Sequence, residues 1–113
     1  SSAASDVYKR QRLDWTQSVR VLANMVRAGS PAPGAWTELR GRRVKLYCAT
    51  VVEVENTVPA PGTVMALVRD GVVVAGGDGS LLFREGQLEG RKRMPAPALA
   101  HGLRLRPADR FGS

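Results

Sequence analysis

The sequence contains one cysteine, Cys48, and one histidine, His101, in 113 residues. A single cysteine excludes an internal disulfide framework and is typical of a reducing compartment. Together the two residues supply too few ligands for a zinc site. The G-x-S-x-G pattern of serine hydrolases is missing, and a lone histidine near a C-terminal turn is more often a surface or capping residue than part of a Ser–His–Asp triad. We therefore expect no catalytic residue and no metal site in this chain.

Aromatic residues and long apolar runs are also scarce. Aromatics make up 5% of the sequence, and no segment approaches the roughly 20 apolar residues that cross a bilayer. The N-terminus lacks the basic and apolar regions of a signal peptide. These absences favour a soluble, cytoplasmic protein without a membrane partner. Cys48 lies in an apolar run, where we expect a small buried side chain and not a reactive thiol.

Positive charge is the most pronounced feature that is present. Seventeen Lys and Arg residues against ten Asp and Glu residues give a net charge of +7, and fourteen of the seventeen are Arg. Such a field favours polyanionic partners: nucleic acid first, an acidic membrane surface or protein second. The alternative is an Arg-rich composition in which the guanidinium groups are simply solvated.

The length allows one domain, or a piece of a longer protein. Residues 1–11 are expected to be a non-native leader. They begin with the low-complexity run "SSAAS", and "DVYKRQ" resembles the translated end of a transposase adapter used in sequencing libraries. The predicted domain is therefore 12–113.

A helix is predicted over about residues 15–28. Asp14 is a favourable N-cap, and Gln17 three residues later completes a capping-box pattern. Gly29 and the following Ser-Pro end the pattern. One apolar stripe runs along this segment at helical spacing: Val19, Leu22, Ala23 and Val26.

The remainder predicts short β-strands joined by tight turns. Asp70-Gly71 and Asp78-Gly79 are pairs that close hairpins, and Pro95 with Pro97 is expected to end the last strand. No helix pattern follows "AGGDGS" (75–80), so we predict a hairpin turn there and not a phosphate-binding loop. The fold class expected is mainly β: a small open OB-like antiparallel barrel preceded by one helix. The strand patterns cover 42–54, 63–70, 71–76 and 80–89.

Cations gather at two places along these strands. Such groups suit a sugar-phosphate backbone, because Arg contacts phosphate through two hydrogen bonds. The alternative is an ordinary solvated face. Because exposed aromatics are scarce, backbone contact is favoured over base stacking. The six candidate binding residues are Arg91, Lys92 and Arg93, and, in second place, Arg42, Arg43 and Lys45.

Several motifs occur in an order that resembles one known family. They include Asp14-Trp15, "PAPGAWTELRGRRVKL" (31–46), "VVVAGGDGSLLF" (72–83), "QLEGRKRM" (87–94) and "HGLRLRPADRF" (101–111), and they span about nine tenths of the chain. The combination resembles the C-terminal domain of methionyl-tRNA formyltransferase and its relatives. In that family the domain is an open β-barrel that follows an N-terminal Rossmann-like catalytic domain.

The resemblance implies a binding role without catalysis for this chain. The family's formyl donor, 10-formyltetrahydrofolate, and its catalytic Asn, His and Asp belong to the N-terminal domain, so no catalytic or cofactor-binding residue is carried over. The implied partners are initiator Met-tRNA, held by its phosphate backbone, and the catalytic domain of the same polypeptide. The family's G-K-K-x-M pattern falls on Gly90, Arg91, Lys92 and Met94.

Two alternative hypotheses remain from the sequence. Related domains also occur in enzymes that do not act on tRNA. The chain is then the structural C-terminal domain of a small-molecule formyltransferase or of a 10-formyltetrahydrofolate hydrolase or dehydrogenase. The remaining alternative is a free-standing OB-like RNA binder. The basic "GRKRM" segment (90–94) and the charge of +7 favour the tRNA-binding reading.

Overall fold

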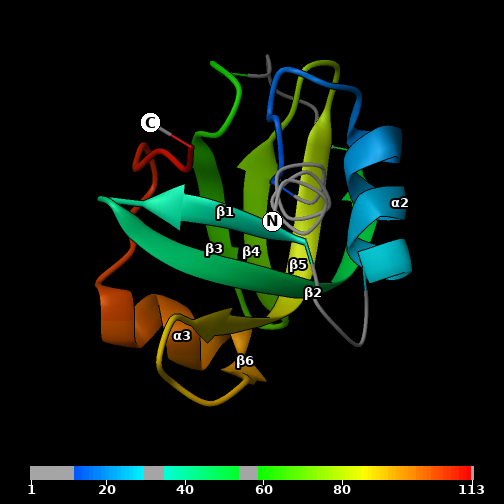
Figure 1. The fold of residues 1–113 in the computed structure, drawn as a ribbon. Helices are drawn as coiled ribbons and strands as arrows, with labels where there is room; N and C mark the ends of the chain where they lie inside the picture. Colours follow the sequence, from blue (N-terminus) through cyan, green and yellow to red (C-terminus); the bar gives the residue numbers. More distant parts are fainter. Residues whose placement is uncertain (1–11, 30–34, 54–58, 113) are drawn as a thin grey trace.

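The computed structural model describes residues 12–29, 35–53 and 59–112, and the expected leader 1–11 lies outside these ranges. Among the described residues, no helix has the length and apolar character needed to cross a membrane. The elements run along the chain (Figure 1) as α2 (Val19–Gly29), β1 (Trp36–Leu39), β2 (Arg42–Val52), β3 (Val64–Val68), β4 (Gly71–Ala75), β5 (Ser80–Leu88), β6 (Met94–Pro95) and α3 (Ala96–Leu103).

One antiparallel sheet organises the molecule. Its strand order is β1-β2-β5-β4-β3, and the short β6 pairs with β5. The mainly-β, open antiparallel class and the four strands expected from the sequence are confirmed. "AGGDGS" connects β4 to β5, which are hydrogen-bonded neighbours, so it is a hairpin turn as expected. The sequence patterns missed β1, β6 and α3.

The sheet curls so that β1 and β2 lie across the other strands (Figure 1). Its concave side holds the core, where Leu46, Phe83 and Phe111 are fully buried. The segment 108–112 hydrogen-bonds to both edges of the curled sheet, near β3 and at β1. The Phe111 N–H donates to the Gly62 carbonyl beside β3 at 2.8 Å, and the Gly112 N–H donates to Glu38 of β1 at 2.7 Å. These bonds occupy edge groups that would otherwise be open to another strand.

The predicted start of α2 is wrong by four residues, because the cap comes from elsewhere. The carboxylate of Asp14 accepts hydrogen bonds from the N–H of Thr16 at 3.0 Å and from its hydroxyl group at 2.6 Å. The N-terminus of α2 is capped instead by Asp78 of the β4–β5 turn, whose Oδ1 accepts the Val19 N–H at 2.9 Å. Gly77 permits this docking: a Cβ at that position would lie 2.1 Å from the Thr16 carbonyl oxygen.

The second helix, α3, covers the end of β5. Pro95 precedes its first residue, and proline is tolerated in a first helical turn because the N–H there has no intrahelical partner. Buried Leu99 and Leu103 pack into the core, and Leu99 lies directly over Gly86 of β5. The prolines therefore begin a helix, whereas the sequence pattern had suggested only the end of a strand. His101 is exposed in the last turn of α3.

Candidate nucleic-acid interface

The first half of β2 separates apolar from polar side chains. Val44 and Leu46 are fully buried in the core. Arg43, Lys45 and Tyr47 alternate with them and so project from the opposite, outer side of the strand. The first half of β2 thus presents two cations and one aromatic residue away from the core.

The neighbouring strand β5 supplies polar partners to the same outer side. Gln87 lies opposite Lys45, and Glu85 lies opposite Tyr47 in the antiparallel register. Tyr47 is buried, with 4% of its surface exposed. Its hydroxyl group donates a hydrogen bond to Gln87 Oε1 at 3.1 Å. The two strands together therefore build a continuous polar surface.

The cation-rich turn that follows β5 is fixed at both ends. The Arg91 N–H donates to the Leu88 carbonyl at 2.9 Å, and Gln87 Nε2 donates to the Arg91 carbonyl at 2.8 Å. On the far side, Met94 pairs with Gly86 in the β5–β6 ladder. Arg91 and Lys92 are therefore held on a closed turn, with both side chains exposed.

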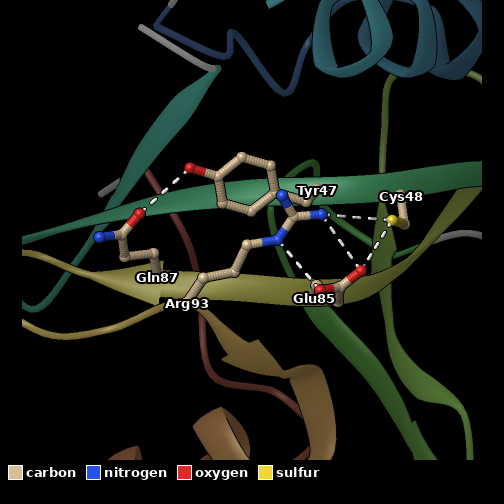
Figure 2. Close-up of polar contacts among 5 residues, drawn as sticks. All are labelled: Tyr47, Cys48, Glu85, Gln87 and Arg93. Atoms are coloured by element: carbon tan, nitrogen blue, oxygen red, sulfur yellow. Dashed lines mark hydrogen bonds and ion pairs between the residues drawn. The ribbon is translucent and has the colours of Figure 1, made fainter. Parts of the chain in front are cut away.

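Arg93 is held against the sheet (Figure 2). Its Nε lies 3.0 Å from Glu85 Oε1, and its guanidinium carbon lies 4.0 Å from the centre of the Tyr47 ring. The thiol of Cys48 and the guanidinium of Arg93 both stabilise the ionised carboxylate and lower the pKa of Glu85. The contribution of this pair to stability is therefore present at neutral pH and is lost as the pH falls through that lowered pKa.

Cys48 is exposed, so the expected burial is wrong. Its φ of +57° marks the point on β2 where the core-facing residues change from Val44 and Leu46 to Ala49. The thiol therefore turns outward and donates to Glu85 Oε2 at 3.0 Å. That hydrogen bond, burial and the negative carboxylate raise the pKa of the Cys48 thiol, against the opposing effect of Arg93. A raised pKa lowers the fraction of thiolate, so we expect this exposed thiol to react slowly.

Replacing Glu85 with glutamine is expected to make Cys48 more reactive. The carboxylate that accepts the thiol hydrogen is the largest cause of the raised pKa, so its loss lowers that pKa and enlarges the thiolate fraction, which is the nucleophile. Because Cys48 is the only cysteine, the rate of a disulfide-exchange reagent at mildly alkaline pH reports it directly. Glu89→Gln, an isosteric change in the following turn, is the control. Equal rates in both variants and the parent would contradict this account of the thiol.

A surface hollow of about 210 Å³ joins β2 to the turn. Arg43 and Lys45 line it, and the segment that follows its other end carries Arg91, Lys92 and Arg93. We call these five cations the basic face. Within the described ranges, the side chains of Lys45, Arg91 and Lys92 make no ion pair or hydrogen bond. The residues that line the hollow are Arg43, Lys45, Gln87, Leu88, Glu89 and Gly90.

Of the six cations predicted from the sequence, five lie on the basic face and Arg42 does not. Arg43 and Lys45 share the hollow with the start of the turn that carries Arg91 and Lys92. Arg42 is exposed, but it leaves the opposite side of β2 and lies outside the hollow. The sequence did not predict Gln87 and Glu85 as part of the site. Their spacing of two residues on a predicted strand could have indicated that both lie on one face, and the structure places them opposite Lys45 and Tyr47.

In the described part of the chain, two larger hollows are lined partly by carboxylates, and a third, which includes His101 and Arg104, is not. One of about 580 Å³ lies at the N-terminus of α2 and contains Glu53 and the capping Asp78 beside Arg20. A carboxylate that faces a phosphate is repelled by it, and this applies also to Glu89 in the hollow beside Arg43 and Lys45. In the described part of the chain, no three His, Cys, Asp or Glu residues gather as they would around a metal ion.

The chain is similar to curated methionyl-tRNA formyltransferases. It is 44% identical over 100 residues to the methionyl-tRNA formyltransferase of Geobacter metallireducens, covering 88% of this chain and 31% of the relative. It is 41% identical over 113 residues to the methionyl-tRNA formyltransferase of Thiobacillus denitrificans, covering 100% of this chain and 37% of the relative. The chain therefore spans about a third of the length of these relatives.

The fold is shared with a solved structure of lower sequence identity. HypX from Aquifex aeolicus, in complex with tetrahydrofolic acid, superposes with a TM-score of 0.72 at 24% identity, covering 82% of this chain and 17% of HypX. The family model described as "Formyl transferase, C-terminal domain" matches residues 7–104. That match includes β1, β2, the cation-rich turn and all of α3. The chain belongs to the formyl transferase C-terminal domain family.

Proposed function

We propose that this chain is the tRNA-binding C-terminal domain of a cytoplasmic methionyl-tRNA formyltransferase. It holds initiator Met-tRNA by the phosphate backbone while a preceding catalytic domain of the same polypeptide transfers the formyl group. Two relatives at 41% and 44% identity that carry this enzyme's name support the proposal. The basic face supports it independently, because the residues that form it are suited to a polyanion.

The observation that carries the proposal is the set of uncompensated cations on the basic face. Lys45, Arg91 and Lys92 are without protein partners in the described ranges, so forming a phosphate contact breaks no existing ion pair. Phosphate contacts of this kind fix the position of a nucleic acid but do not read its sequence. We therefore assign the domain a holding role and leave the choice of initiator tRNA to the catalytic domain.

The proposal places the chemistry outside this chain. The donor would be 10-formyltetrahydrofolate, and the acceptor the α-amino group of methionine on the tRNA. His101 is exposed on α3 and has no carboxylate partner among the described residues. We therefore assign neither the donor nor a proton-transfer step to the residues described here.

The proposal is tested by fluorescence anisotropy of labelled tRNA titrated with the 113-residue chain. We expect binding in the micromolar range at roughly 50 mM salt and a steep loss at roughly 200 mM, because the bound cations displace counterions from the phosphates. Failure of a folded chain to bind at the lower salt concentration would refute the proposal. It would favour a structural C-terminal domain of a formyltransferase that acts on a small molecule.

A further inference from the structure

Two guanidinium groups on the basic face lie over aromatic rings. Arg93 is 4.0 Å from the centre of the Tyr47 ring, and Arg43 is 4.5 Å from the centre of the Trp36 ring. Both rings are 4% exposed, so neither can itself accept a base. The aromatic rings instead serve as supports that orient the two guanidinium groups along the surface.

Arg93 keeps an open side. Tyr47 covers one side of its guanidinium, and Glu85 accepts hydrogen bonds at the edge from Nε at 3.0 Å and from the second terminal nitrogen at 3.2 Å (Figure 2). Even so, 42% of the side-chain surface remains exposed. A planar cation whose edge and one face are occupied offers its other face, and RNA bases stack on guanidinium planes.

We infer that the basic face binds an unpaired stretch of RNA. A base stacks on the open side of Arg93, and the neighbouring phosphates contact Lys45, Arg91 and Lys92. This inference rests on the proposed function and names the RNA element that the same site takes. Bases inside an A-form duplex are stacked on one another and unavailable. Stacking on Arg93 therefore requires a loop or single strand, and it adds base contact to the phosphate contact expected from the sequence.

The spacing on β2 accommodates more than one nucleotide. Arg43 and Tyr47 are four residues apart on the strand, roughly 13 Å, and Lys45 lies between them with its cross-strand neighbour Gln87. The hollow of about 210 Å³ opens between these residues and the turn. Arg43 on Trp36 is therefore placed to support a second base, with Lys45 available for the phosphate between them.

Arg93→Lys separates stacking from charge. Lysine keeps the positive charge but lacks the planar guanidinium. The full 113-residue chain is titrated into labelled single-stranded RNA of roughly eight nucleotides, into the same backbone with abasic sugars, and into duplex RNA. We expect the parent chain to bind the base-containing strand about 10-fold more tightly than the abasic strand. Arg93→Lys should lower this ratio toward one without weakening abasic binding, and Arg43→Lys with Arg93→Lys should abolish it.

Arg69→Lys in the β3–β4 turn is the matched control and should leave the ratio unchanged. If the parent chain binds the abasic and base-containing strands equally, stacking is refuted while the holding function stands, and this comparison does not depend on any variant folding. Tighter binding of the duplex than of the single strand would also overturn the inference. If none of the three RNAs binds at low salt, both the proposed function and this inference fail.

Discussion

Replacing Lys45, Arg91 and Lys92 together with glutamate is expected to weaken tRNA binding on the order of 100-fold at roughly 50 mM salt. These three side chains have no protein partner in the described ranges. Their reversal therefore removes phosphate contacts without breaking an ion pair of the fold. Anisotropy titrations of labelled tRNA measure the loss, and the thermal midpoint of the variant shows whether the domain is intact.

A second variant with the same change in net charge serves as the control for this prediction. Arg20, Arg69 and Arg106 are exposed on α2, the β3–β4 turn and the C-terminal segment, away from the hollow that joins the cations of the basic face. Their replacement with glutamate changes the overall field equally. We expect a much smaller loss of affinity from it. Equal losses in the two variants would mean that the total charge, and not the basic face, holds the tRNA.

Gly71→Ala is expected to destabilise the domain strongly. A Cβ on Gly71 would lie 2.2 Å from the backbone oxygen of Phe83 and 2.9 Å from a methyl of Leu82. Both atoms belong to β5, the neighbour of β4, so relief requires the two strands to separate. Strain of this kind costs roughly 2–3 kcal/mol, which lowers the thermal midpoint by roughly 10 to 20 °C.

Gly102→Ala is the matched comparison for that loss. Gly102 lies in α3, and a Cβ there would have nothing within 4 Å. Alanine favours the helix over glycine by roughly 0.5–1 kcal/mol, so the midpoint should stay the same or rise slightly. A Gly71→Ala variant that unfolds within about 2 °C of the parent chain would show that β4 and β5 approach less closely than described.

The sequence predicted the features that depend on local pattern. Alternation and β-branched residues located β2 to β5, and the absence of a helix after "AGGDGS" identified the hairpin turn. The hairpin turn predicted at Asp70-Gly71 lies one residue earlier, at Arg69-Asp70, because Val68 pairs with Gly71 and Gly71 begins β4. Neither Asp70 nor Gly71 has the positive φ that the prediction assumed. Gly71 is required by the closeness of β5, which only the assembled sheet creates.

The features that depend on distant contacts could not be predicted. The cap of α2 is Asp78, 59 residues from Val19, so the local candidate Asp14 was chosen instead. The same limit applied to the site. Arg91, Lys92 and Arg93 are consecutive in sequence, but only Arg93 meets Glu85 and Tyr47, through the β5–β6 pairing. Neighbouring cations of one motif therefore have different roles.

The most direct test of the central claim is the salt dependence of tRNA binding by the parent chain and by the Lys45, Arg91, Lys92 glutamate variant. Each phosphate contact contributes roughly 0.7–0.9 to the slope of log affinity against log salt concentration. If the basic face holds the phosphate backbone, the variant's slope should be shallower than the parent's by about 2 to 2.7, the sum of three contacts. Parallel slopes would contradict the account and place the tRNA on another surface of the domain.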